Sequence, residues 1–191
     1  MRVVDHEERR RKIAEVAMDL IARIGLEATT LDRIAKEMGA SIRIITHYFP
    51  DKDTLLLWVY RAMALQGQHP IQDVIAHDPA DLPGALMALC GGDEATLNRW
   101  RVYVAFWDKA ARSPQFAAEQ QLWIERTLAT ISEIIIARTS SAASVRQLAM
   151  ELISLVYGMS VQRMLDPESW TPKAIASVIE RRVREVDSLA K

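Results

Sequence analysis

The side chains of residues 42–47 are of the types that read the edges of DNA bases. The segment reads Ile-Arg-Ile-Ile-Thr-His, and no acidic residue occurs between Glu37 and Asp51. An arginine guanidinium donates two parallel hydrogen bonds to O6 and N7 of guanine, which is worth roughly 1–3 kcal/mol of discrimination against another base. Arg43 is therefore the first candidate for a base contact, on a surface that is locally free of negative charge.

Two short helices around a glycine turn must position these side chains. Apolar residues recur at helical spacing from 31 to 38 and predict the first helix. Thr29, with Asp32 three residues on, resembles a capping-box start, and Gly39 ends the helix. Ser41 can cap the second helix. This spacing is that of a helix-turn-helix, which lays its second helix in the major groove of DNA.

The second helix has an inward and an outward face. Ile45, Tyr48 and Phe49 recur at i, i+3 and i+4 and are expected to face the core. The outward side chains, which we expect to face DNA, are Ile42, Arg43, Ile44, Thr46 and His47. The two isoleucines either touch thymine methyl groups or pack inward on a rotated helix, and we favour the thymine contact for Ile44.

The same stretch resembles the tetracycline-repressor (TetR) family of bacterial transcription regulators. The matching residues are Gly25, Thr29-Thr30, Ile34-Ala35, Gly39-Ala40-Ser41, the run from His47 to Lys52, and Leu55-Leu56. The resemblance implies an all-α fold of about nine helices, with a DNA-binding domain of three helices over residues 1–50 and an effector-binding and dimerisation bundle over 51–191. By family position, the expected phosphate contacts are Thr30, His47, Tyr48 and Lys52. The implied function is that of a homodimeric repressor that a small-molecule effector releases from its operator.

The overall charge is not typical of a nucleic-acid-binding protein, since the formal net charge is −1 and the pI is about 6.4. The basic run from Arg9 to Lys12 either forms an arm that reaches the DNA backbone or minor groove, or is the solvated start of a helix.

Helical spacing continues to the end of the chain. Residues 67–83 hold three Xaa-Pro pairs, which indicates a connection with a turn or two of helix and a boundary between domains. The helix predicted over 145–165 is apolar around most of its circumference and must be buried on two sides. The resemblance implies that it pairs, together with the last helix (about 172–189), with the copies in a homodimer. The alternative is burial within one chain.

The chain also resembles a narrower branch of the family, the choline-responsive betaine repressors, at three places: the run from Ile44 to Phe49, the run from Trp100 to Trp107, and Tyr157-Gly158. That likeness implies a small cationic effector, because aromatic faces attract quaternary ammonium groups by roughly 0.5–2 kcal/mol each. Tyr157 and Ser160 depart from the residue types expected in this branch. The candidate effector-binding residues are Trp100, Tyr103, Trp107, Trp123, Met63 and Tyr157. The alternative for an aromatic stripe at helical spacing is plain core.

Enzyme chemistry finds no support in the sequence. The four histidines precede the main bundle, and there is no glycine-rich phosphate loop, nucleophile elbow or metal-ligand spacing. A single cysteine, Cys90, excludes an intrachain disulfide and a cysteine metal cluster. We therefore expect no enzymatic activity, no cofactor and no metal, and the alternative to a ligand-controlled repressor is a constitutive DNA-binding factor. Apolar runs are too short for a membrane helix and no signal segment is seen, so a cytoplasmic location is expected.

Overall fold

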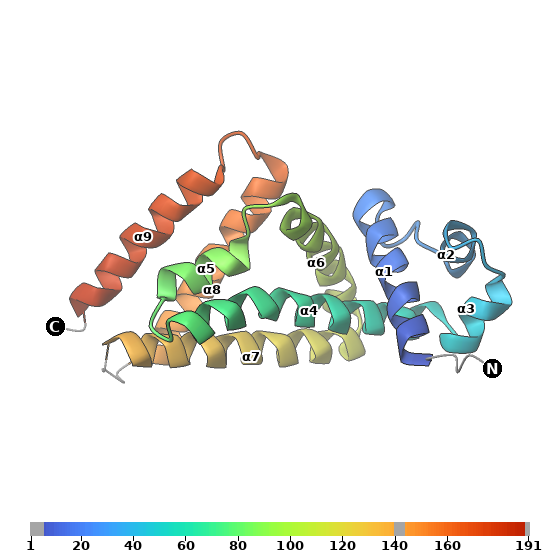
Figure 1. The fold of residues 1–191 in the computed structure, drawn as a ribbon, viewed down its shortest axis with the longest axis horizontal. Coiled ribbons are helices and arrows are strands. Elements are labelled where there is room, and N and C mark those ends of the chain that lie inside the picture. The colour runs from blue at the N-terminus through green and yellow to red at the C-terminus, as the bar shows by residue number, and fades with distance from the viewer. Residues whose placement is uncertain (1–5, 140–143, 190–191) are drawn as a thin grey trace. The chain divides into compact units, whose positions relative to one another are not determined.

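The fold is all-α, as predicted. A computed structural model describes residues 6–139 and 144–189, and these residues form nine helices (Figure 1). The helices are α1 (His6–Ile24), α2 (Leu31–Glu37), α3 (Ile42–Tyr48), α4 (Lys52–His77), α5 (Leu82–Cys90), α6 (Glu94–Arg112), α7 (Pro114–Thr139), α8 (Val145–Leu165) and α9 (Pro172–Leu189).

The chain divides into two compact units. The first comprises residues up to Leu65 together with Arg101–Glu119, and the second comprises Gln66–Trp100 and the residues from Gln120 onward. The first unit therefore contains α1, α2 and α3, the first half of α4, the second half of α6 and the start of α7. The second unit contains α5, α8 and α9 with the remaining parts of α4, α6 and α7. Helices α4, α6 and α7 each run from one unit into the other.

Short-range polar contacts shape the helix-turn-helix. Thr30, not Thr29, is the N-cap of α2, and its hydroxyl accepts a hydrogen bond from the Arg33 amide (3.2 Å). Thr29 is buried, and its hydroxyl donates to the Gly25 carbonyl (2.8 Å), which closes the preceding turn. The capping expectation was thus wrong by one residue. Gly39, with a φ of +60°, ends the first helix of the motif as predicted, in a conformation that only glycine adopts without strain.

Residues 67–83 are mostly helical, which corrects the prediction of a connection. Helix α4 passes through Pro70 and continues to His77. A proline removes one hydrogen bond of a helix, and here Ile71, only 2% exposed, packs into the core directly beyond it. Burial of the Ile71 side chain offsets part of that local cost. Only residues 78–81 connect α4 to α5, which Asp81 caps by accepting a hydrogen bond from the Gly84 amide (2.8 Å).

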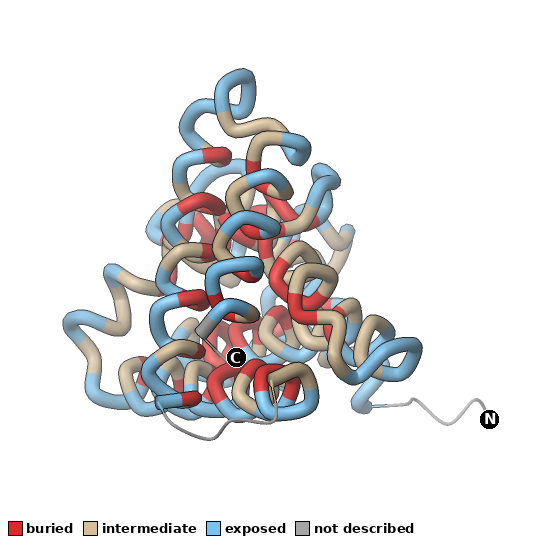
Figure 2. The backbone as a smooth tube through the Cα atoms, turned by 90° about the vertical axis from the view of Figure 1, so that its left-hand side faces the viewer, coloured by how far each residue is buried: buried red, intermediate tan, exposed pale blue. Residues whose placement is uncertain are grey.

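The core of the second unit joins the end of α4 to α5, α7, α8 and α9. Buried and exposed positions alternate along the helices as expected for amphipathic segments (Figure 2). The apolar stripe of α9 is buried within its own chain, through Ile175, Ile179 and Val183. Helix α8 buries one face through residues such as Leu152, Val156 and Met159, and exposes the other.

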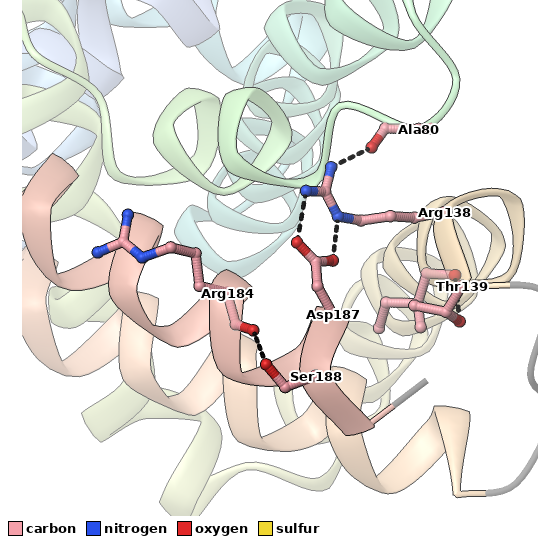
Figure 3. A network of polar contacts seen from close by, with 7 residues as sticks. Ala80, Arg138, Thr139, Arg184, Asp187 and Ser188 are labelled. Carbon is pink, nitrogen blue, oxygen red and sulfur yellow. Dashed lines mark hydrogen bonds and ion pairs between the residues drawn. The ribbon is translucent and has the colours of Figure 1, made fainter. Parts of the chain in front are cut away.

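Two arginines tie the second unit together. Arg138 on α7 makes a bidentate ion pair with Asp187 on α9 (2.6 and 2.9 Å) and donates to the Ala80 carbonyl (3.1 Å), so one side chain joins α7, α9 and the α4–α5 turn (Figure 3). Arg163 on α8 is buried and donates to the carbonyls of Gly91 and Gly92 (2.8 and 2.9 Å). These contacts fix the turn before α6.

Candidate nucleic-acid interface and effector region

Helix α3 presents the faces that its spacing predicted. Ile45 and Phe49 are buried and Tyr48 is half-buried. Ile42 and Ile44 are 47% and 36% exposed, so the alternative in which they pack inward on a rotated helix is excluded. Every member of the outward set is exposed. The surface available to a partner is therefore made by two isoleucines, an arginine, a threonine and a histidine.

Arg43 and His47 lie at the centre of that surface. Residues four apart share a helix face, and this face is opposite to the side occupied by Ile45 and Phe49. Among the described residues, the Arg43 guanidinium has neither a carboxylate nor a carbonyl partner, and it is exposed. Its donors are thus available for a base edge, as bidentate reading of guanine requires.

The candidates for phosphate contact are engaged to different degrees. Thr30 is exposed, and because its hydroxyl oxygen accepts from the Arg33 amide, its proton remains able to reach a phosphate. Lys52 is half-buried, and its ammonium donates to the carbonyls of Leu26 (2.8 Å) and Glu27 (3.2 Å). Lys52 therefore clasps the α1–α2 turn to the start of α4, with at most one proton left for DNA.

One residue of this surface was not anticipated from the sequence. His6, at the start of α1, lies beside Tyr48 (ring centroids 5.7 Å apart) and His47 (6.4 Å). The His47 and Tyr48 rings are themselves 5.1 Å apart, edge to face. No local pattern signals a contact between residues more than forty positions apart. His6 thus extends the aromatic and imidazole surface at the end of α3 onto α1.

Several acidic side chains around the motif pair with a basic side chain or cap a helix. Arg23 pairs with Glu37 (2.5 Å) and Asp19 (3.0 Å). Asp51 accepts a hydrogen bond from the Thr54 amide (2.7 Å) at the start of α4, which lowers the pKa of its carboxyl. The basic side chains of the motif are therefore not opposed by unpaired carboxylates at these positions, although the whole chain is slightly acidic.

The basic run at residues 9–12 lies within α1. Arg10 pairs with Glu7, Arg11 with Glu15 and Lys12 with Glu8. The structure thus favours a solvated helix start over a free arm.

In the first unit, aromatic residues of α6 pack against α4. The Tyr103 ring stacks on Tyr60 (5.9 Å) and meets Trp107 edge to face (5.5 Å). Tyr103 and Trp107 are half-buried, whereas Met63 on α4 is buried. Lys109 on α6 pairs with Asp53 at the start of α4 (2.7 Å). The second half of α6 is thereby joined to the helix that follows the helix-turn-helix.

The other three candidates belong to the second unit. The Trp100 and Tyr157 rings meet edge to face (5.1 Å), and the Trp100 indole donates to the Leu89 carbonyl (3.2 Å). Trp123 on α7 is buried, and the Arg126 guanidinium lies over its ring at 4.5 Å. The structure therefore brings together Trp100 with Tyr157, and Tyr103 with Trp107.

Residues 6–139 and 144–189 show neither a metal site nor a membrane-spanning helix. No group of three or more histidine, cysteine or acidic side chains there is arranged to hold a metal ion. None of the helices in these ranges combines the length and the apolar character needed to cross a membrane.

Two protein-family models match the chain. One, described as "Bacterial regulatory proteins, tetR family", matches residues 13–59. The other, described as "BetI-type transcriptional repressor, C-terminal", matches residues 80–187, which is more than half of the chain.

Relatives of known sequence agree with these matches. The transcriptional regulator PksA of Bacillus subtilis is 26% identical over 190 residues, which cover 96% of this chain and 92% of PksA. The transcriptional regulator BetI of Klebsiella pneumoniae is 30% identical over 132 residues, 64% of this chain and 66% of BetI.

Solved structures share the fold. A transcriptional regulator from Rhodococcus sp. Rha1 superposes with a TM-score of 0.84 at 23% identity, covering 93% of this chain and 95% of its own. A transcriptional regulator from Saccharomonospora viridis, solved in complex with choline, gives a TM-score of 0.81 at 22% identity, covering 93% and 96%.

Proposed function

Because the chain belongs to the TetR family of bacterial transcription regulators, we propose that it is a homodimeric repressor that a small-molecule effector releases from operator DNA. The observation that carries the proposal is the recognition helix α3, whose outward side chains are all exposed and are centred on a guanidinium without a partner among the described residues. In this proposal, residues 1–50 bind DNA, and residues 51–191 bind the effector and dimerise.

The roles at the DNA divide between bases and phosphates. Arg43 reads guanine, with Ile42, Ile44 and Thr46 beside it in the groove. Thr30, His47, Tyr48 and the remaining proton of Lys52 hold the backbone, which sets register without reading sequence. Support for this division comes from exposure and hydrogen bonding: Arg43 is exposed, whereas Thr30 and Lys52 already make hydrogen bonds to the backbone of the motif.

The proposed dimer interface is the exposed face of α8, flanked by α9. Met150 and Leu165 are 52% and 70% exposed, and Ser154, Gly158 and Val161 share their side of the helix. An apolar stripe that a single chain leaves open fits a second copy, as in helix bundles. Since the stripe of α9 is already buried in its own chain, α8 supplies the apolar part of this interface.

A glycine gives a sharp test of the interface. A Cβ at Gly158 meets no atom within 4 Å, so Gly158→Arg leaves the single chain intact but places a charge in the proposed interface. We expect light scattering to give a dimer for the wild type and a monomer for the variant. Ala129→Arg, at an exposed position of α7, is the control and stays dimeric. A Gly158→Arg protein that remains a dimer contradicts this interface.

Release is proposed to act through α6 and α4. An effector bound at the aromatic residues of α6 shifts that helix, and the shift reaches α4 through the Tyr60–Tyr103 stacking and the Lys109–Asp53 ion pair. Movement of α4 changes the separation of the two recognition helices, whose half-sites must lie about 34–36 Å apart or at a multiple of that distance. A coupling of about 1–3 kcal/mol, typical of allosteric proteins, lowers operator occupancy about 5- to 150-fold.

Choline is a rational first probe, because it is bound by a relative of the same fold. Tryptophan fluorescence of the wild type is titrated with choline, and Trp100→Phe and Trp107→Phe identify the responding rings. A saturable change that accompanies loss of operator binding supports control by a small cation. If neither choline nor a broader set of small molecules alters operator binding, the protein is a constitutive DNA-binding factor.

The proposal of sequence-specific DNA binding is tested by selection from a library of random duplexes. The full-length protein is expected to enrich an inverted repeat, because a twofold dimer mirrors its symmetry in its site. A selected pool in which no sequence is enriched, or in which the enriched sequences contain no inverted repeat, contradicts the proposal.

A further inference from the structure

Two isoleucines flank the proposed guanine-reading arginine on the surface of α3. Successive residues of a helix are turned by about 100°, so Ile42 and Ile44 lie on opposite sides of Arg43. Both are more than a third exposed, and neither belongs to the core. A surface built to bind a polyanion gains nothing from exposed aliphatic groups unless its partner offers apolar groups in return.

Thr46 adds to this apolar character. Its hydroxyl donates to the backbone carbonyls of Ile42 (3.2 Å) and Arg43 (3.3 Å) within the helix. The proton is therefore engaged and is not offered to an acceptor on a base. Thr46 lies one turn beyond Ile42 and places a second methyl-bearing side chain on the same flank.

The major groove offers only one apolar group to such a surface. Purines and cytosine present donors and acceptors there, whereas thymine presents the C5 methyl group. An isoleucine against a polar base edge removes water from that edge without supplying a hydrogen bond, which is unfavourable. An isoleucine against a methyl group removes apolar surface from water on both sides.

We propose that α3 reads a guanine flanked on both sides by thymine methyl groups, with Arg43 on the guanine, Ile42 and Thr46 on one flank and Ile44 on the other. This inference rests on the proposed function, since it specifies the DNA that the same surface binds. The half-site then carries thymines, on either strand, within one or two base pairs of the guanine on each side. Specificity at these positions depends on methyl groups rather than on hydrogen bonds.

The test replaces thymine by deoxyuridine in the selected duplex, one position at a time. This change removes the methyl group and keeps every hydrogen-bonding group of the base. For the wild type, we expect the dissociation constant to rise about fourfold for each contacted methyl group, the value for about one buried carbon. The rise should occur at positions on both flanks of the guanine.

Variants then assign the flanks. With Ile44→Ala the penalty for deoxyuridine should disappear on one flank only. With Ile42→Ala it should fall on the other flank only, where the methyl group of Thr46 remains. Both residues are exposed, so neither change disturbs the core. Ile136→Ala, at an exposed isoleucine of α7, is the matched control and keeps the full wild-type pattern.

The outcomes separate the two proposals. Equal binding of thymine and deoxyuridine duplexes by the wild type, or penalties that persist unchanged in both isoleucine variants, overturns the methyl-reading inference while sequence-specific binding stands. Failure to enrich any sequence from the random library overturns the proposed function and this inference together.

Discussion

Lys52 offers the clearest case in which the structure changes what a substitution is expected to do. Its ammonium donates to the Leu26 and Glu27 carbonyls, the first bond partly buried and the second exposed. A hydrogen bond from a charged donor contributes about 1.5–3 kcal/mol, and partial exposure reduces this, so the two together contribute about 2 kcal/mol. Lys52→Met should therefore lower the melting temperature by about 4–8 °C in a chain of 191 residues.

The same variant also tests the phosphate contact. Loss of one phosphate contact reduces the magnitude of the negative slope of log K against log salt concentration by about 0.9 for each half-site. Binding to specific and to non-specific DNA is affected alike. Melting is followed by circular dichroism at fixed protein concentration, because the proposed dimerisation would make the melting temperature concentration-dependent. DNA binding is measured by fluorescence anisotropy at a temperature where the variant is fully folded.

A matched lysine supplies the control. Lys36 is 76% exposed and pairs with Asp32 on the surface of α2, so Lys36→Met should change stability by no more than about 0.5 kcal/mol. If Lys52→Met melts within a degree of Lys36→Met, the clasp on the α1–α2 turn contributes nothing. If its salt slope equals that of the wild type, Lys52 does not contact phosphate.

Three further predictions concern a buried thiol, two glycines and an ion pair. Burial raises the pKa of the Cys90 thiol from 9.0 to about 11. The stability that comes from the neutral thiol is therefore complete below pH 9 and is lost as the pH rises toward 11. Urea unfolding at pH 8 and 10.5 should show this loss in the wild type and not in Cys90→Ala. Gly91→Ala should destabilise the protein by well over the roughly 1–2 kcal/mol expected for Gly25→Ala. Both glycines have a positive φ, but only at Gly91 would the new Cβ lie 2.0 Å from a threonine methyl group. Similar losses in denaturant midpoint for the two variants would refute the steric argument. Arg138→Met should lower the free energy of unfolding by about 1–2 kcal/mol, because the bidentate ion pair with Asp187 is lost. A double-mutant cycle with Asp187→Asn should show a coupling energy above about 0.5 kcal/mol. Additive losses would mean that the pair contributes nothing.

Local periodicity was sufficient to predict the recognition helix. Three inward positions at i, i+3 and i+4 fix the rotation of a short helix, and the outward face then follows from geometry alone. That is why the exposure of Arg43 and His47 agrees with the expectation from sequence. The N-cap of α2 was misplaced because two threonines adjoin, and only the tertiary turn at Gly25 decides which hydroxyl is free to cap.

Long-range packing accounts for what the sequence did not reveal. Helix α4 continues through Pro70, and the next residue, Ile71, is buried in the core of the second unit. A local rule for proline does not take such tertiary burial into account. The contact of His6 with Tyr48 joins distant segments and leaves no pattern. An aromatic stripe has the same spacing whether it fills a core or lines a site, so the roles of Trp100 and Tyr103 rest on ligand binding rather than on periodicity.

The specificity ratio of the protein for its selected duplex tests the central claim most directly. Anisotropy titrations at 150 mM salt compare that duplex with a scrambled one of equal composition, for the wild type and for Arg43→Ala. We predict that the wild type prefers the selected duplex at least about a thousandfold, as specific DNA-binding proteins do. In Arg43→Ala the preference should fall about 5- to 150-fold for each half-site, while binding to the scrambled duplex changes little. Equal affinity of the wild type for both duplexes, or an unchanged ratio in Arg43→Ala, would contradict the account.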